Sequence, residues 1–456
     1  MAISESAAAP VAGARSLSVI DCIGIGINGV IGSGIFMLPA LVFRHAGGQA
    51  PLAWLLVGGV CFLVGLCFAE AASHTDKSGG PYEYASLAFG REIGYAVGFI
   101  AVASMVLSYA TVARGFAEHL VVFVPSVRGR EVWVGGGVMA ALAAANLVGL
   151  KPGAWTSNFF SAAKLLPLFA FVVVGLVVVG GDRLTASLAA APAPRPGEHV
   201  GLVGAAMAGL FACTGFEFVS VPAGETKNPS RAVPLALLGS LGASVALYAL
   251  VQWVAMAALP HLGDASPPIA AAAGAIAGPM GERFLVAGAL VSSFGFCAGS
   301  ALVGPVYLAA FATDGMAPGV LGRRSRGGSP WVAVLAYTVA AALLGNLGDF
   351  SRLADISNIA VVAQYLPTCL AVILLRRRWA QAPADPHRFR LAGGPVIPLL
   401  ATAGCLMFLS RVQFASTRDD AGAWVPSEGQ VCLAILAVGF ALRLAFVATR
   451  RFTKVS

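Results

Sequence analysis

The chain has 456 residues, of which 58% are hydrophobic and only 11% are charged, and its mean hydropathy is +0.83. Soluble globular proteins carry about 25% charged residues, so this composition excludes that class and indicates a polytopic protein whose main partner is the lipid bilayer. The formal net charge of +8 does not indicate a nucleic-acid partner. The basic residues lie at the ends of apolar segments, where they set membrane topology.

Apolar segments of roughly the length that a helix needs to cross a bilayer recur along the chain. They predict an all-α membrane protein with twelve transmembrane helices, at about 18–43, 51–72, 93–124, 132–150, 158–180, 200–223, 233–259, 284–312, 331–347, 356–375, 395–414 and 430–449. Lys and Arg are more frequent in the connections on the side of the termini than in those on the other side. This bias predicts cytoplasmic termini in the cell membrane.

The first span is unusual because Gly29, Gly32 and Gly34 fall within six residues of it. Each glycine weakens a helix by about 1 kcal/mol relative to alanine. Two structures fit this pattern. One is a close-packing face of small residues. The other is an unwound stretch whose free amide N–H groups and half-helix N-terminus face an anionic group, which requires a protein-lined or water-filled cavity.

The sixth span carries a second interruption. The stretch from Gly209 to Glu217 places small and polar residues and one carboxylate at its middle, which predicts another broken helix. Breaks in the first and sixth spans stand at matching positions of two five-span halves, a pattern typical of an inverted-repeat transporter. The Glu217 carboxylate is compatible with two roles: a group linked to protons, or a hydrogen-bond acceptor for the unwound backbone.

Lys164 lies inside the fifth span. An intramembrane lysine is costly and indicates a functional site, although a lysine near a span end can also extend to the membrane surface. Neither a nucleophile motif nor metal-ligand spacing is present, so no catalytic residue, metal, cofactor or disulfide is predicted. An integral-membrane enzyme would need clustered catalytic residues and a channel a continuous polar lining, and the spans supply neither.

Several short motifs, in this order and spacing, resemble amino-acid permeases of the amino acid, polyamine and organocation (APC) superfamily over essentially the whole chain. They are Gly32-Ser-Gly-Ile-Phe36 with Pro39, Ser78-Gly-Gly-Pro-Tyr-Glu-Tyr84, Lys164-Leu-Leu, Gly215-Phe-Glu217, Lys227-Asn-Pro-Ser-Arg231 with Pro234, and Asp314-Gly-Met-Ala-Pro318. The resemblance implies a LeuT-like fold with two inverted repeats, 18–180 and 200–375. Two additional helices occupy 395–449, and the cytoplasmic tails are 1–17 and 450–456.

The resemblance also implies a substrate site between spans 1, 3, 6 and 8. There the carboxylate of an amino acid meets backbone amides of the first break, and its ammonium group meets carbonyls of both breaks. The implied substrate-binding residues are Val30, Ile31, Gly32, Ser33, Gly34, Phe211, Ala212, Cys213, Thr214, Gly215 and Ser300. Phe211 occupies the position of the aromatic lid, or gate.

Lys164 matches the lysine of sodium-independent members, which sits where sodium-coupled relatives bind a cation. There it is either a fixed structural cation or a group that exchanges a proton during the cycle. The resemblance therefore implies a sodium-independent secondary transporter that moves an amino acid by alternating access, coupled to protons or to exchange. Ser300 stands where arginine/agmatine exchangers of the superfamily carry tryptophan, and Ala212 and Cys213 are small. These differences favour a neutral amino acid. The alternative within the class is a polyamine or cationic amino-acid antiporter.

Overall fold

The computed structural model describes residues 18–74, 80–148, 154–193, 200–220, 226–325, 327–379, 388–391, 393–418 and 424–452. The predicted tail 1–17 lies outside these residues, as do 78 and 79 of the Ser78 motif. The predicted tail 450–456 begins inside the last helix, and only its residues 453–456 lie outside the described part.

The described chain is helical almost throughout. Its α-helices are α1 (Val19–Val30), α2 (Gly34–Met37), α3 (Pro39–Ala46), α4 (Ala50–Ser73), α5 (Pro81–Phe89), α6 (Arg91–Phe123), α7 (Glu131–Leu147), α8 (Ala154–Val179), α9 (Gly181–Ser187), α10 (Leu202–Cys213), α11 (Pro229–Ala258), α12 (Pro268–Thr313), α13 (Trp331–Leu344), α14 (Phe350–Trp379), α15 (Val396–Leu409) and α16 (Glu428–Phe452). Short 3-10 turns are η1 (Gly47–Gln49), η2 (Pro125–Val127), η3 (Phe216–Ser220), η5 (Leu262–Asp264) and η6 (Gly319–Gly322). Strands β1 (Thr417–Arg418) and β2 (Trp424–Val425) form one antiparallel pair.

Eight segments of the described residues are long and apolar enough to cross a membrane, and four shorter apolar helices accompany them: α7, α10, α13 and α15. The predicted eighth span at 284–312 lies within α12, after a kink at which the backbone is not helical. Helix α12 begins at Pro268 and continues past a kink at Ala277 and Gly278. The charged pair Glu282 and Arg283 ended the apolar run in the sequence but does not end the helix.

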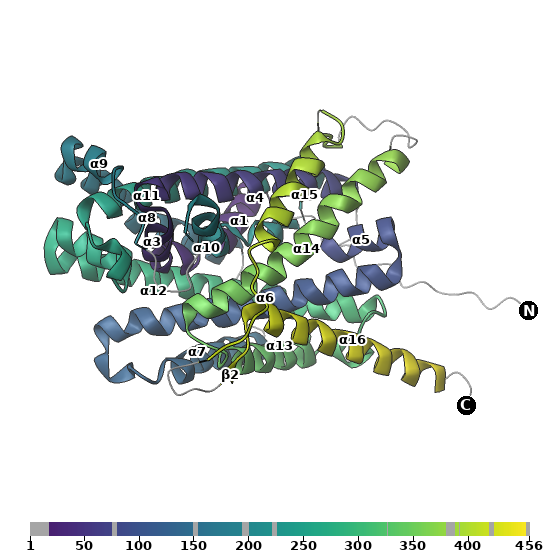
Figure 1. Ribbon diagram of the computed structural model, residues 1–456. Coiled ribbons are helices and arrows are strands. Elements are labelled where there is room, and N and C mark those ends of the chain that lie inside the picture. The colour runs from purple at the N-terminus through teal and green to yellow at the C-terminus, as the bar shows by residue number, and fades with distance from the viewer. Residues whose placement is uncertain are drawn as a thin grey trace, which may run out of the picture.

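Helix α1 lies inside the bundle, where it packs against α8, α11 and α12. Its last residue Val30 and the following Ile31 are at most 2% exposed. Figure 1 shows α14 crossing beside α6, with α15 and α16 farther out. Residues from distant parts of the sequence therefore surround the end of α1.

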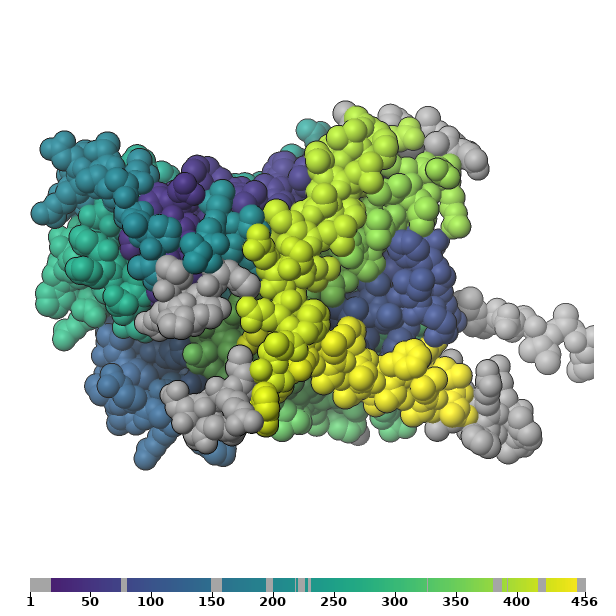
Figure 2. Space-filling model, in the orientation of Figure 1, coloured from purple at the N-terminus to yellow at the C-terminus, as the bar shows by residue number. Residues whose placement is uncertain are grey.

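Helices α15 and α16 lie on the outer surface of the face shown in Figure 2. Large apolar side chains are exposed on them: Leu399, Leu400, Leu406, Phe440 and Leu442. Exposed apolar surface of this kind is typical of helices that face lipid. On its inner side α16 is fixed to α6, because the Arg443 guanidinium contacts the Glu92 carboxylate at 2.8 Å.

Polar contacts tie the helices together at the end of the bundle that carries α5. The Tyr82 hydroxyl donates to the Asp314 carboxylate at the end of α12. Burial raises the pKa of Tyr82, so the hydroxyl stays a neutral donor. The guanidinium of Arg376 on α14 donates two hydrogen bonds, of 2.9 and 2.6 Å, to the buried Glu70 carboxylate on α4. These contacts join segments that are far apart in the sequence.

Candidate functional site

The first helix is interrupted at the glycines, so of the two structures that their spacing allows it adopts the unwound one. Helix α1 ends at Val30, Ile31 is extended with φ −86° and ψ 96°, and α2 starts at Gly34. A Cβ atom on Gly34 would lie 2.8 Å from the Ala212 Cβ of α10, so only glycine fits this close approach. The last carbonyls of α1 and the first amides of α2 lack intrahelical partners at such a break. They are therefore free to contact a ligand or a side chain.

The second interruption follows α10. Thr214 is extended, with φ −89° and ψ 170°, and Gly215 has a φ of +98°, which favours glycine. A Cβ atom on Gly215 would lie only 2.2 Å from the carbonyl oxygen of Gly29 in α1. Gly215 therefore meets the end of α1, as Gly34 meets α10 at Ala212. The structure brings the two breaks into direct contact.

Lys164 of α8 reaches the end of α1. Its Nζ donates to Asn28 Oδ1 at 2.8 Å, to the Ile31 carbonyl at 2.5 Å and to the Asn28 carbonyl at 3.2 Å. The residue is 0% exposed, so it does not extend to the membrane surface. A helix C-terminus carries partial negative charge and unpaired carbonyls, which an ammonium group stabilises. Asn28 in turn donates to the Gly295 carbonyl of α12 at 3.3 Å.

The Glu217 carboxylate lies just after the second break and is buried. Its Oε2 accepts hydrogen bonds from the Gly215 amide at 2.9 Å and from the Tyr365 hydroxyl of α14 at 2.7 Å. One of these donors belongs to the unwound backbone itself. The arrangement therefore favours the interpretation of Glu217 as an acceptor that stabilises the break.

A small cavity lies between the two breaks, α6 and α12. Every residue that lines it is buried. Eight of the predicted site residues line it: Val30, Gly32, Gly34, Phe211, Ala212, Thr214, Gly215 and Glu217. The other lining residues are Gly29, Ser104, Met105, Ser108, Val112 and Phe296. The lining is thus buried, polar at the breaks and at the two serines of α6, and apolar at Met105, Val112 and Phe296.

The remaining predicted site residues are Ile31, Ser33, Cys213, Ser300 and Lys164, and they do not belong to this lining. The Ile31 carbonyl is occupied by Lys164. The Ser300 hydroxyl is 2.8 Å from the hydroxyl of Tyr337 on α13, and Phe296, one turn earlier on α12, lines the cavity instead. Ser33 is buried against α6, with its Cβ 2.8 Å from the position of a Cβ on Gly115.

Sequence reasoning placed span 3, which is α6, at the site but named none of its residues. Ser104, Ser108 and Val112 are four residues apart and therefore share one face of this helix. Ser108 lies 3.0 Å, oxygen to oxygen, from Ser357 of α14, and Gln364 of α14 donates to Ser104 at 3.2 Å. Two serines one helical turn apart on the same face of this span were the available signal.

The chain is similar in sequence to known membrane transporters. The family model described as amino acid permease matches residues 17–440. An uncharacterized transporter of Mycobacterium tuberculosis H37Rv is 29% identical over 416 residues, covering 85% of each chain. A branched-chain amino acid permease of Bacillus subtilis is 26% identical over 424 residues, covering 87% of each chain. A serine/threonine exchanger of the same bacterium is 25% identical over 420 residues, covering 88% of this chain and 92% of its own.

Proposed function

Because this chain belongs to the amino acid permease family, and is therefore a multi-pass membrane transporter of amino acids and not an enzyme, we propose that it carries a neutral amino acid across the cell membrane without sodium. The proposed cycle is alternating access, coupled either to protons or to exchange for another amino acid. The observation that carries the proposal is the cavity with a buried lining that both helix breaks border.

The proposed architecture is a LeuT-like pair of inverted repeats, 18–180 and 200–375, followed by two helices in 395–449, with cytoplasmic termini. The eight long segments and the four shorter apolar helices support it, since together they supply twelve apolar elements in the predicted order. The interruptions after α1 and α10 support it as well, because broken helices at matching positions of two halves mark the substrate site of such carriers.

In the proposed bound state, the substrate carboxylate meets the amides of Gly32, Ser33 and Gly34 at the start of α2. Partial positive charge at a helix N-terminus stabilises an anionic group there. The ammonium group meets carbonyls at the ends of α1 and α10, where partial negative charge gathers. Val30 and Phe211 of the cavity lining would each offer a carbonyl that already accepts one hydroxyl, from Tyr248 at 3.4 Å and from Thr214 at 2.9 Å. The Phe211 ring acts as the lid.

The lining supports a neutral substrate side chain. Glu217 is its one ionisable side chain, and that carboxylate already accepts from Gly215 and Tyr365. Met105 and Val112 provide apolar surface beside the hydroxyls of the α6 serines. Two of the similar proteins of Bacillus subtilis are named for branched-chain amino acids and for serine and threonine, which are neutral as well, whereas other relatives at 26% identity are named for cationic amino acids and for methylthioribose.

Sodium independence is proposed from Lys164. Its ammonium group takes three oxygens at the end of α1, two of Asn28 and one of Ile31. Oxygen atoms of this kind are the ligands that a hard cation needs. The Lys164 ammonium group therefore takes the place of a bound cation, and it joins α8 to α1.

The test is a thermal-shift screen of the detergent-purified protein against the common amino acids and polyamines, with and without sodium. A ligand that binds only the folded state raises the melting temperature by mass action, by about 2.7 kcal/mol of stability at 100 times its Kd. We expect shifts with a small group of neutral amino acids, equal in both salts. Shifts with polyamines or cationic amino acids alone, or shifts that require sodium, would overturn the proposal.

A further inference from the structure

The Phe211 ring is backed by a second buried aromatic ring, Phe350, which is the first residue of α14. The two ring centres are 5.7 Å apart and the rings are nearly perpendicular, at 88°. Phe350 is only 1% exposed and does not line the cavity itself. The position of the lid is therefore coupled by direct packing to the first turn of α14.

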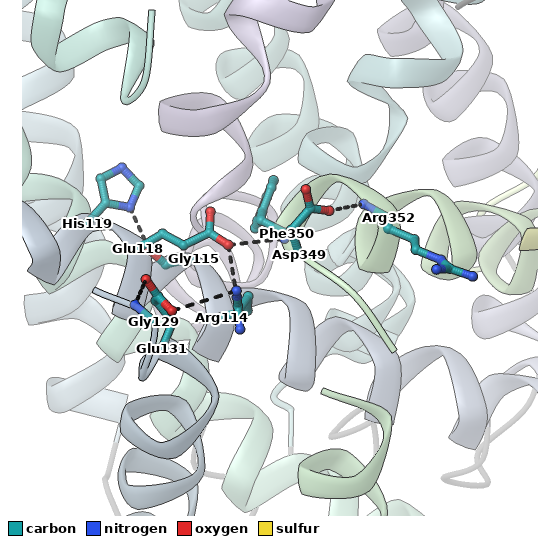
Figure 3. Close-up of polar contacts among 9 residues, drawn as sticks. All are labelled: Arg114, Gly115, Glu118, His119, Gly129, Glu131, Asp349, Phe350 and Arg352. Atoms are coloured by element: carbon teal, nitrogen blue, oxygen red, sulfur yellow. Dashed lines mark hydrogen bonds and ion pairs between the residues drawn. The ribbon is translucent and has the colours of Figure 1, made fainter. Parts of the chain in front are cut away.

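The first turn of α14 is held by a carboxylate from another helix. Glu118 of α6 accepts a hydrogen bond from the Phe350 backbone amide at 3.2 Å. Figure 3 shows this carboxylate between Phe350 and Arg114, whose Nε donates to the same oxygen at 3.0 Å. The first amides of a helix have no intrahelical acceptor, and an anion is stabilised at that end by the helix dipole. Glu118 therefore caps α14 from outside.

The surroundings of Glu118 are close-packed, and Arg114 pairs with it while the carboxylates of Glu131 and Asp349 also lie nearby. Arg114 also lies 3.9 Å from Glu131 at the start of α7, and Glu131 accepts from the Gly129 amide at 2.9 Å.

A Cβ atom on Gly115 would lie 3.0 Å from Phe350 Cδ2 and 2.9 Å from Ser33 Oγ. The C-terminal part of α6 thus meets both the start of α14 and the first break. This place is far from the start of α6 (Figure 1).

We propose that Glu118 is a positioning residue for the lid: its hydrogen bond to Phe350 holds the first turn of α14 so that Phe350 keeps Phe211 over the cavity. In alternating access the cavity must open to one side at a time. Opening at this end separates α14 from α6 and breaks the Glu118 contact. This inference rests on the role proposed above for Phe211 as the lid.

The experiment measures how often the cavity opens. A single added thiol, Val112→Cys, places a reporter in the lining, and the described native cysteines are all buried. The rate of its reaction with a water-soluble methanethiosulfonate is followed by mass spectrometry in detergent, without substrate. Adding Glu118→Ala should accelerate this reaction about tenfold or more, since a hydrogen bond to a charged group is lost. Glu118→Gln keeps an acceptor oxygen and should give a smaller acceleration.

The matched control is Glu92→Gln, which also removes a carboxylate of α6 that pairs with an arginine, but at the other end of that helix. It should leave the reporter rate unchanged. The inference would be overturned if the reporter reacted at the same rate in both Glu118 variants as in the protein that carries Val112→Cys alone. It would also be overturned if the native cysteines were labelled at the same time, because that labelling indicates unfolding. Glu118→Gln carries the test if Glu118→Ala does not fold. Because the assay needs no substrate, failure of the amino acid proposal would be seen separately in the thermal-shift screen.

Discussion

At the scale of single residues, Lys164 shows how one buried charge organises a site. Its ammonium group is inaccessible to solvent and is matched by oxygens of Asn28 and Ile31. Burying a charge without such partners costs far more than a single hydrogen bond returns. The interruption of α1 supplies the Ile31 carbonyl, so the break and the lysine depend on each other.

We expect Lys164→Ala to reduce substrate uptake into liposomes about tenfold or more at every pH, because the oxygens it pairs lose their partner inside the protein. The matched control is Ser161→Ala, one turn earlier on α8, which removes a neutral 2.7 Å hydrogen bond to the Gly24 carbonyl of the same helix α1. That variant should keep most of its uptake. Unchanged uptake with an unchanged pH profile in Lys164→Ala would refute both a fixed and a proton-exchanging role.

At the scale of elements, glycine residues permit the close contacts between the two helix breaks. Gly34 allows contact with α10, and Gly215 allows contact with α1 at a φ of +98°. Side chains at these positions would clash with backbone atoms, which cannot move aside as a flexible side chain does. The breaks therefore depend on residue size at two points and on the capping of Gly215 by Glu217.

Gly215→Ala should abolish the ligand-induced thermal shift and lower the melting temperature of the free protein, since its Cβ would lie 2.2 Å from the Gly29 oxygen. Gly239→Ala is the matched control. Its Cβ would meet open space within α11, so it should leave ligand binding intact and stabilise the helix by about 1 kcal/mol. Wild-type ligand binding by Gly215→Ala would show that the close approach is not needed.

At the scale of the whole molecule, a few buried polar contacts join distant helices. The pair formed by Glu70 and Arg376 connects α4 with α14, and the Glu70 side chain is only 2% exposed while that of Arg376 is 16% exposed. Breaking a buried pair by removing one partner is costly because it leaves an uncompensated charge. This contact lies at the end of α14 opposite to Phe350, so both ends of that helix are fixed by carboxylates.

Arg376→Met should destabilise the protein by about 3 kcal/mol, measured as a lower melting temperature in detergent. The double variant Glu70→Gln with Arg376→Met should recover part of the loss, because no charge then remains unpaired. Arg378→Met is the control, because Arg378 is exposed and its guanidinium donates to a neutral backbone carbonyl, that of Leu87, at 2.7 Å. A double variant as unstable as the single one would argue against a coupled pair.

Composition and local pattern alone placed this chain in the membrane and located its helix breaks. Hydropathy is a property of each segment, and the cost of glycine in a helix acts on its own backbone, so both can be inferred without knowing the neighbours. The motifs around Gly32, Lys164 and Gly215 also pointed to the amino acid permease family, which the family comparison confirms.

Only the tertiary structure decided which side chains meet. Ser104 and Val112 line the cavity while Ser300 turns toward Tyr337, because the rotation of α6 and α12 about their axes is set by packing against other helices. Hydrogen bonds such as that from Phe350 to Glu118 join residues separated by 232 positions. Contacts between residues so far apart in the sequence depend on how the whole bundle is packed. No local stretch of sequence determines that packing.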